Sequence, residues 1–173
     1  MKNSELKKED FHPFYEPYIA TLGDVELLEM LRRQLQNFPQ FISSIPNDKL
    51  QHTYSEGKWT VAQVLVHILD TERVFQYRAL RFARNDKTPL PGFDQDMFVS
   101  ESNAVNWNKE ELIENYGTIR QSTIALFEKF SDQTLKRVGI ASDSPMSVAA
   151  LGFICCGHQK HHRNILRERY LKD

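Results

Sequence analysis

Two histidines near the end of the chain have a spacing that suits a shared metal ion. His158 and His162 are four residues apart within a stretch whose apolar residues recur with helical spacing. Four residues along an α-helix return to nearly the same face, with a rotation of about 40°, so both imidazoles can reach one point beside the helix. Such a pair also occurs by chance on surface helices, so a metal site needs a third ligand from elsewhere.

His67 is the candidate for that third ligand. It interrupts an apolar run formed by residues 64–66 and 68–69. A lone histidine in such a run is usually a core residue bonded to a carbonyl or carboxylate. Three such histidines on two helices favour a shared divalent metal, so we predict a site formed by His67, His158 and His162. Zn, Ni, Fe or Mn would suit these ligands and keep a coordination position open, as in catalytic sites.

Asp70 follows His67 by three residues and shares its face of the predicted helix. It could orient the His67 imidazole, serve as a fourth ligand, or act as a catalytic base. The competing interpretation is a solvated acid paired with Arg73, three residues further on. Glu72 points away from this face, and we expect it to be solvated. Two other polar side chains share the face of His67: Thr71 and Arg78.

Two further residues lie close to the histidine pair in the sequence. Cys155 precedes His158 by three residues, so it could be a ligand or a wall of the pocket, but we favour a small apolar filler. His161 is rotated by about 100° from His162. We therefore expect His161 beside the ligands or on the surface rather than among them.

Four amphipathic segments must position these side chains. Apolar residues recur at helical spacing over residues 24–44, 60–84, 108–130 and 147–171. We expect Pro39 to kink or interrupt the first of these helices. No alternation is strong enough to predict a sheet, so the fold class is all-α, an antiparallel or crossover four-helix bundle.

Capping residues support the starts of three helices. Thr60 with Gln63, and Asn108 with Glu111, have the spacing of capping boxes. Ser147 is a suitable N-cap for the last helix. These signals fix where the helices carrying the histidines begin.

The connections between helices differ in character. We expect residues 1–22 to form an irregular or extended N-terminal arm, because Pro13 and Pro17 oppose a regular helix. Residues 86–108 form a long loop between the second and third helices, and a loop of this length is usually functional or packed over another part of the domain. Its aromatic residues could roof the pocket: Phe93, Phe98 and Trp107. Residues 131–146 read as a polar linker, and residues 1–173 as a single domain.

Composition excludes several classes of function. The formal net charge is −1, with 22 basic and 23 acidic residues, so nothing indicates a nucleic-acid partner. The longest uncharged, apolar-leaning stretch, residues 144–157, is shorter than the roughly 20 residues that span a bilayer. Cys155 and Cys156 are adjacent and cannot pair with each other. With a charged N-terminus that lacks an apolar core, these features predict a cytoplasmic protein.

Three segments together resemble the DinB/YfiT-like superfamily: residues 58–73, 89–94 and 157–162. The resemblance spans roughly residues 25–171. It implies a four-helix bundle whose metal is held by one histidine of the second helix and the pair in the last, here His67, His158 and His162. It also implies a small-molecule substrate and a homodimer.

The resemblance implies more than one activity, because some members are thiol-dependent S-transferases and others are described as metal-dependent hydrolases. Characterised members use low-molecular-weight thiols such as bacillithiol or mycothiol, and one is a mycothiol-dependent maleylpyruvate isomerase. Our first expectation is therefore transfer of a metal-activated thiol to a small electrophile. The alternatives are a metal-dependent hydrolase with Asp70 as a possible base, and a non-enzymatic, metal-binding dimeric module.

Overall fold

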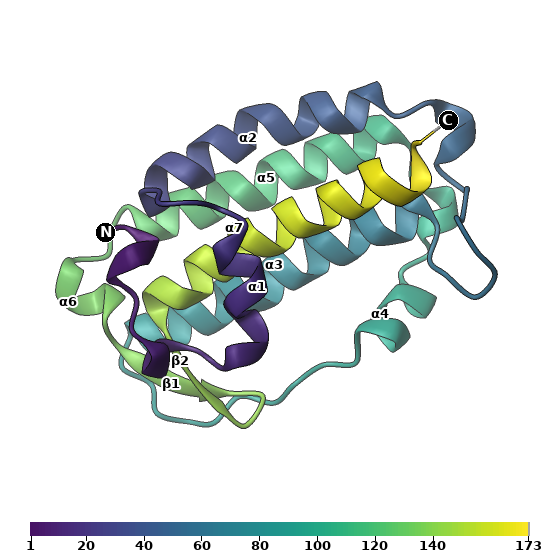
Figure 1. Ribbon diagram of the computed structural model, residues 1–173. Coiled ribbons are helices and arrows are strands. Elements are labelled where there is room, and N and C mark those ends of the chain that lie inside the picture. The colour runs from purple at the N-terminus through teal and green to yellow at the C-terminus, as the bar shows by residue number, and fades with distance from the viewer. Residues whose placement is uncertain (173) are drawn as a thin grey trace.

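Four long helices lie side by side in the computed structural model, which describes residues 1–172 (Figure 1). They are α2 (Leu27–Ser44), α3 (Val61–Ala83), α5 (Lys109–Phe127) and α7 (Val148–Ile165). α3 packs on α7 and α5, and α2 packs on α5 and α7. A π-helical turn (Leu166–Tyr170) extends α7 at its C-terminal end. The predicted four-helix bundle is confirmed.

The two predicted capping boxes form at the starts of α3 and α5. The Thr60 hydroxyl accepts a hydrogen bond from the Gln63 amide at 3.1 Å, and the Gln63 side chain accepts one from the Thr60 amide at 2.8 Å. Asn108 and Glu111 form the same reciprocal pair at the start of α5. α2 starts at Leu27 and continues unbroken to Ser44 through Pro39, so the proline does not interrupt it.

Glu72 is buried, and the prediction that it is solvated is wrong. Its carboxylate accepts two hydrogen bonds from the Arg120 guanidinium, at 2.7 and 2.8 Å, and one from the Thr123 hydroxyl at 2.9 Å. Arg120 also donates to the Gln34 side-chain oxygen, and the Gln34 amide donates to the Cys156 carbonyl oxygen. This buried polar network ties α2, α3, α5 and α7 together. Helical periodicity alone did not reveal it, because Glu72 faces a partner helix.

The segment predicted as a polar linker carries secondary structure. It contains α6 (Asp132–Leu135) and an antiparallel hairpin of β1 (Val138–Ala141) and β2 (Ser144–Ser147). Ser142 and Asp143 both have positive φ, as the tight turn requires. The hairpin lies on α3 at Gly139, where an added Cβ would meet the Phe82 ring at 2.1 Å.

The N-terminal arm is also more regular than expected. It contains α1 (Glu16–Ala20), in which Pro17 occupies the first turn, where no helical N–H is needed. α1 lies across α7 (Figure 1). A Cβ on Gly157 would lie 2.3 Å from the Tyr18 carbonyl oxygen, so only glycine permits this close contact. The arm therefore rests directly on the helix that carries His158 and His162.

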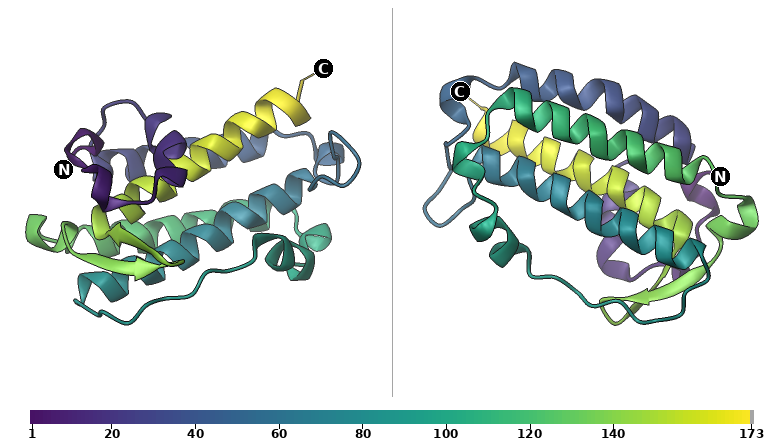
Figure 2. Two further views of the ribbon diagram at one scale, coloured as in Figure 1. Left: turned by 60° about the horizontal axis from the view of Figure 1, so that its bottom comes forward. Right: turned by 180° about the vertical axis from the view of Figure 1, so that it is seen from behind.

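The long loop after α3 returns along the same helix (Figure 2). It contains α4 (Gln95–Glu101), which Asp94 caps through the amides of Asp96 and Met97. Leu90 pairs with Ala141, so the loop is attached to the hairpin. Within residues 1–172, no helix is long and apolar enough to cross a membrane.

Candidate metal centre

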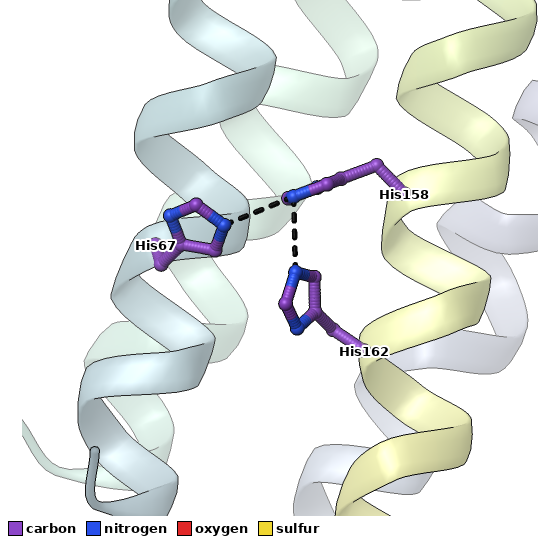
Figure 3. Close-up of side chains that lie close together, drawn as sticks. All are labelled: His67, His158 and His162. Atoms are coloured by element: carbon purple, nitrogen blue, oxygen red, sulfur yellow. Dashed lines mark hydrogen bonds between the residues drawn. The ribbon is translucent and has the colours of Figure 1, made fainter. Parts of the chain in front are cut away.

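The three predicted histidines meet between α3 and α7 (Figure 3). The His158 Nε2 atom lies 2.9 Å from Nε2 of His67 and 3.0 Å from Nε2 of His162. One ligand atom from each of the three residues falls within 4.8 Å of the other two, so the group could hold a metal ion. His158 and His162 reach this point from adjacent turns of α7, as their spacing predicts.

The three imidazoles are neutral at physiological pH. His67 is 3% exposed and His158 is 8% exposed. Burial lowers the pKa of His67 to about 4 and that of His162 to about 3. Burial, together with the neighbouring imidazoles, holds the pKa of His158 well below its ordinary value. Neutral imidazole is the form that binds metals, because its free ring nitrogen carries a lone pair.

Aromatic rings hold the imidazoles in place. The Trp59 ring lies 4.8 Å from that of His67, centroid to centroid, and the Tyr18 ring lies 5.7 Å from that of His158. Tyr18 also meets His161 edge to face at 4.9 Å, which places His161 beside the three histidines and not among them. The packing restricts how far each ring can turn.

Two pockets are lined in part by the three histidines. The first, of about 160 Å³, is lined by His67 and His158 with residues from the arm, α3 and the loop: Phe14, Tyr15, Tyr18, Thr71, Phe75, Arg78, Phe93, Gln95 and Ser142. The second, of about 240 Å³, contacts His162 and is lined largely by aromatic and charged residues: Tyr54, Lys58, Trp59, Asp96, Arg169 and Tyr170. The cluster is therefore accessible to small molecules.

Asp70 lies outside both pockets. Its carboxylate accepts a hydrogen bond from Arg73 at 3.0 Å, which is the pairing that the competing interpretation predicts. Partial burial raises the pKa of Asp70, opposed by the Arg73 charge. Cys155 is buried in the apolar core, where burial raises the pKa of its thiol. Both residues are placed for packing or pairing rather than for contact with the three Nε2 atoms.

Part of the expected roof is present. Phe93 lines the first pocket and packs on Phe98, with ring centroids 5.1 Å apart. Trp107 instead packs against the core around α3 and α5. The arm supplies the rest of the roof through its aromatic residues, which the sequence marks only as a dense aromatic stretch between prolines. The sequence also did not reveal that Asp96 lines the second pocket. A carboxylate in a long loop has no periodicity that shows which way its side chain points.

Comparison with known proteins identifies the family to which this fold is related. A model of the DinB superfamily matches residues 30–166. A protein of Oceanobacillus iheyensis, provisionally named as metal-dependent hydrolase OB0413, is 25% identical over 149 residues, covering 84% of this chain and 85% of that protein.

Two solved structures share the fold. One is YfiT from Bacillus subtilis, described as a probable metal-dependent hydrolase with an unusual four-helix bundle topology. It has a TM-score of 0.69 and 18% identity, and the match covers 96% of this chain and 89% of YfiT. The other is a mycothiol-dependent maleylpyruvate isomerase, with a TM-score of 0.66 and 11% identity, covering 81% of this chain and 60% of the isomerase.

Proposed function

Because the chain belongs to the DinB superfamily, we propose that it is a metal-dependent hydrolase whose metal is held by His67, His158 and His162. The observation that carries the proposal is the convergence of three neutral imidazoles, two of them buried and one half-buried, which also line two pockets. The provisional name of the O. iheyensis relative, a metal-dependent hydrolase, supports the same reaction class.

The donor set fits a divalent transition metal. Nitrogen ligands about 2.0–2.1 Å from a tetrahedral zinc lie roughly 3.3 Å apart, close to the 2.9 and 3.0 Å between these Nε2 atoms. The His158 Nε2 faces two other Nε2 atoms, and one ring proton can satisfy only one of them. A cation among the three nitrogens accepts all three lone pairs. Zn, Ni, Fe and Mn all accept imidazole ligands.

A metal bound there supplies Lewis-acid chemistry, because it lowers the pKa of water and polarises a carbonyl oxygen. The chain supplies the rest. Trp59 and Tyr18 hold the imidazole rings, and the two pockets admit a small substrate. Three neutral protein ligands leave room for water and substrate, as in catalytic zinc sites.

We assign the proton acceptor to Asp96 rather than to Asp70. Asp96 lines the pocket that contacts His162, and its charge acts on His67, whereas Asp70 is paired with Arg73. In ester hydrolysis the bond from the carbonyl carbon to the leaving oxygen breaks and a bond to the water oxygen forms. One proton of that water passes to Asp96, which returns it to the leaving oxygen.

Two proposals compete with hydrolysis. One is thiol transfer, and the other is a metal-binding dimer without enzymatic activity. The resemblance in fold to the mycothiol-dependent isomerase, at 11% identity, supports only the architecture. The two pockets that the histidines line favour an enzyme over a closed binding module.

A thiol-free assay separates these proposals. The purified protein is loaded in turn with Zn, Mn, Ni and Fe(II), and hydrolysis of a panel of 4-nitrophenyl esters is followed without any thiol. We expect turnover that a chelator abolishes and that His67→Ala lacks. Turnover of an electrophile only when a low-molecular-weight thiol is added would instead establish the S-transferase. Metal binding without turnover, both with and without added thiol, would instead support the non-enzymatic metal-binding module.

A further inference from the structure

The first pocket contains a buried arginine that has no acidic partner in the part of the chain that the structure describes. Arg78 is 2% exposed and lines the pocket that His67 and His158 also line. Its Nη2 atom donates to the Pro91 carbonyl oxygen at 2.9 Å and to the Ser142 hydroxyl at 3.0 Å. Among residues 1–172, no carboxylate lies within 4.0 Å of this guanidinium.

Arg120 shows how this chain treats another buried arginine. Arg120 is fully buried, and the Glu72 carboxylate accepts two hydrogen bonds from its guanidinium. Leaving a buried charge without a counter-ion costs several kcal/mol by order of magnitude. Arginine cannot escape this cost by losing its proton, because it remains charged in proteins. The contrast indicates that the counter-ion of Arg78 comes from outside the described chain.

Thr71 adds a second unpaired group to the same pocket. The residue is 3% exposed, and its hydroxyl is buried without a hydrogen-bond partner among residues 1–172. Thr71 lies one turn after His67 on α3, and Arg78 lies eleven residues after His67 on nearly the same face. The pocket wall therefore presents, in order, an imidazole, a hydroxyl donor and a guanidinium.

From this order we infer that the pocket accepts a small substrate that has an oxyanion at the end remote from its reacting group. The oxyanion is either a carboxylate or a phosphate. The oxyanion pairs with Arg78, the Thr71 hydroxyl donates to the middle of the substrate, and the reacting group lies at His67 and His158. The assignment of a reacting end rests on the proposed hydrolase function, while the oxyanion site rests on Arg78 alone.

The distance along α3 separates the two ends of the substrate. Eleven residues at about 1.5 Å each place the Cα atoms of His67 and Arg78 about 16 Å apart. A helical side chain is directed toward the N-terminus of its helix, so the guanidinium extends back toward His67 and shortens this gap. A group that contacts Arg78 is therefore several bonds away from the reacting carbonyl.

A matched pair of esters tests the inference in the metal-loaded protein. The first is 4-nitrophenyl hydrogen glutarate, which has a terminal carboxylate, and the second is 4-nitrophenyl pentanoate, which has the same chain length and no charge. We expect kcat/KM to favour the glutarate ester by tenfold or more. Arg78→Gln should abolish the preference and Arg78→Lys should restore part of it. Arg84→Gln, which removes an exposed charge from the end of the same helix, should leave it unchanged.

Calorimetric titration of the metal-free protein gives a readout that does not depend on catalysis. Pentanoate should bind at least tenfold more tightly than neutral pentanamide, and Arg78→Gln should remove this difference. A third titration uses inorganic phosphate. Whichever of pentanoate and phosphate binds more tightly to the wild type shows whether the substrate's oxyanion is a carboxylate or a phosphate.

The outcomes separate the oxyanion site from the hydrolase. Equal turnover of both esters, with equal binding of pentanoate and pentanamide, overturns the oxyanion site and leaves the hydrolase intact. Binding that requires Arg78, with no turnover of either ester, supports the oxyanion site and overturns the hydrolase. The preference for the charged ester is measured in the wild-type protein. The inference can therefore be disproved even if the Arg78→Gln protein does not fold.

Discussion

The Nε2 atoms of His67 and His158 lie 2.9 Å apart although the two residues are 91 positions apart in the chain. This approach depends on how α3 and α7 are held against each other. The buried network that joins Glu72 of α3 through Arg120 and Gln34 to the Cys156 carbonyl of α7 links the two helices. The geometry of the candidate metal centre therefore rests on a polar network elsewhere in the core.

Removing the Glu72 carboxylate should strongly destabilise the protein. In Glu72→Ala the Arg120 charge remains buried without its partner, and we expect a loss of about 3–5 kcal/mol in the free energy of unfolding. Asp70→Ala is the matched control on the same helix, because the Asp70–Arg73 pair is partly exposed and should contribute about 1 kcal/mol or less. Urea denaturation measures both. Equal losses in the two variants would contradict the account.

The stability of the metal-free protein should fall between pH 7 and pH 5. The folded-state pKa of His67 is about 4, below its ordinary value of 6.5, so in this range the unfolded chain binds protons that the folded chain does not. Stability is therefore lost as the pH falls. His67 alone should account for about 2 kcal/mol of this loss.

Urea denaturation of the chelator-treated protein at pH 7, 6 and 5 measures this dependence. His67→Gln, which cannot titrate, should show a shallower fall over the same range. Identical slopes for the wild type and His67→Gln would mean that the His67 pKa is not lowered in the folded protein.

Replacing Gly157 should displace the arm from α7. The alanine Cβ would meet the Tyr18 carbonyl oxygen at 2.3 Å, so α1 must shift and the Tyr18 ring with it. We expect faster proteolysis within residues 11–22 and a loss of about 1–3 kcal/mol in unfolding free energy. Gly117→Ala on α5 is the control, since nothing lies within 4 Å of its added Cβ, and it should stabilise by up to about 1 kcal/mol. Unchanged proteolysis in Gly157→Ala would disprove the close contact.

The sequence was sufficient to predict the bundle and the meeting of the histidines. Helical periodicity and side-chain caps are local properties, and Thr60, Asn108 and Ser147 cap the helices that they were predicted to cap. The spacing of His158 and His162 fixes their common face for the same reason. Their meeting with His67 follows from packing the apolar faces of two helices together.

The features that the sequence did not reveal depend on contacts between distant segments. Glu72 was predicted to be solvated because nothing near it in the chain identifies Arg120 as its partner. The hairpin was missed because its strands have four residues each and its turn, at Ser142 and Asp143, lacks glycine. The direction of Asp96 depends on how a long loop packs against α3, which no local pattern encodes.

Asp96 should be needed for hydrolysis but not for metal binding. Asp96→Asn removes the proton acceptor and keeps the shape of the side chain, so we expect turnover to fall about 100-fold while the metal content stays unchanged. Asp70→Asn should retain most of the activity, since Asp70 lies outside both pockets. The reverse order of the two effects would move the role of base to Asp70. Ester turnover with metal-loaded protein measures both variants.

The metal content of the purified protein tests the central claim most directly. Elemental analysis of the wild type should find one equivalent of a divalent transition metal per chain. His158→Ala should lose it, whereas His161→Ala, altered on a neighbouring face of the same helix, should keep it. A wild-type protein that binds no transition metal, or a His158→Ala protein that retains a full equivalent, would contradict the assignment of His67, His158 and His162 as a metal centre.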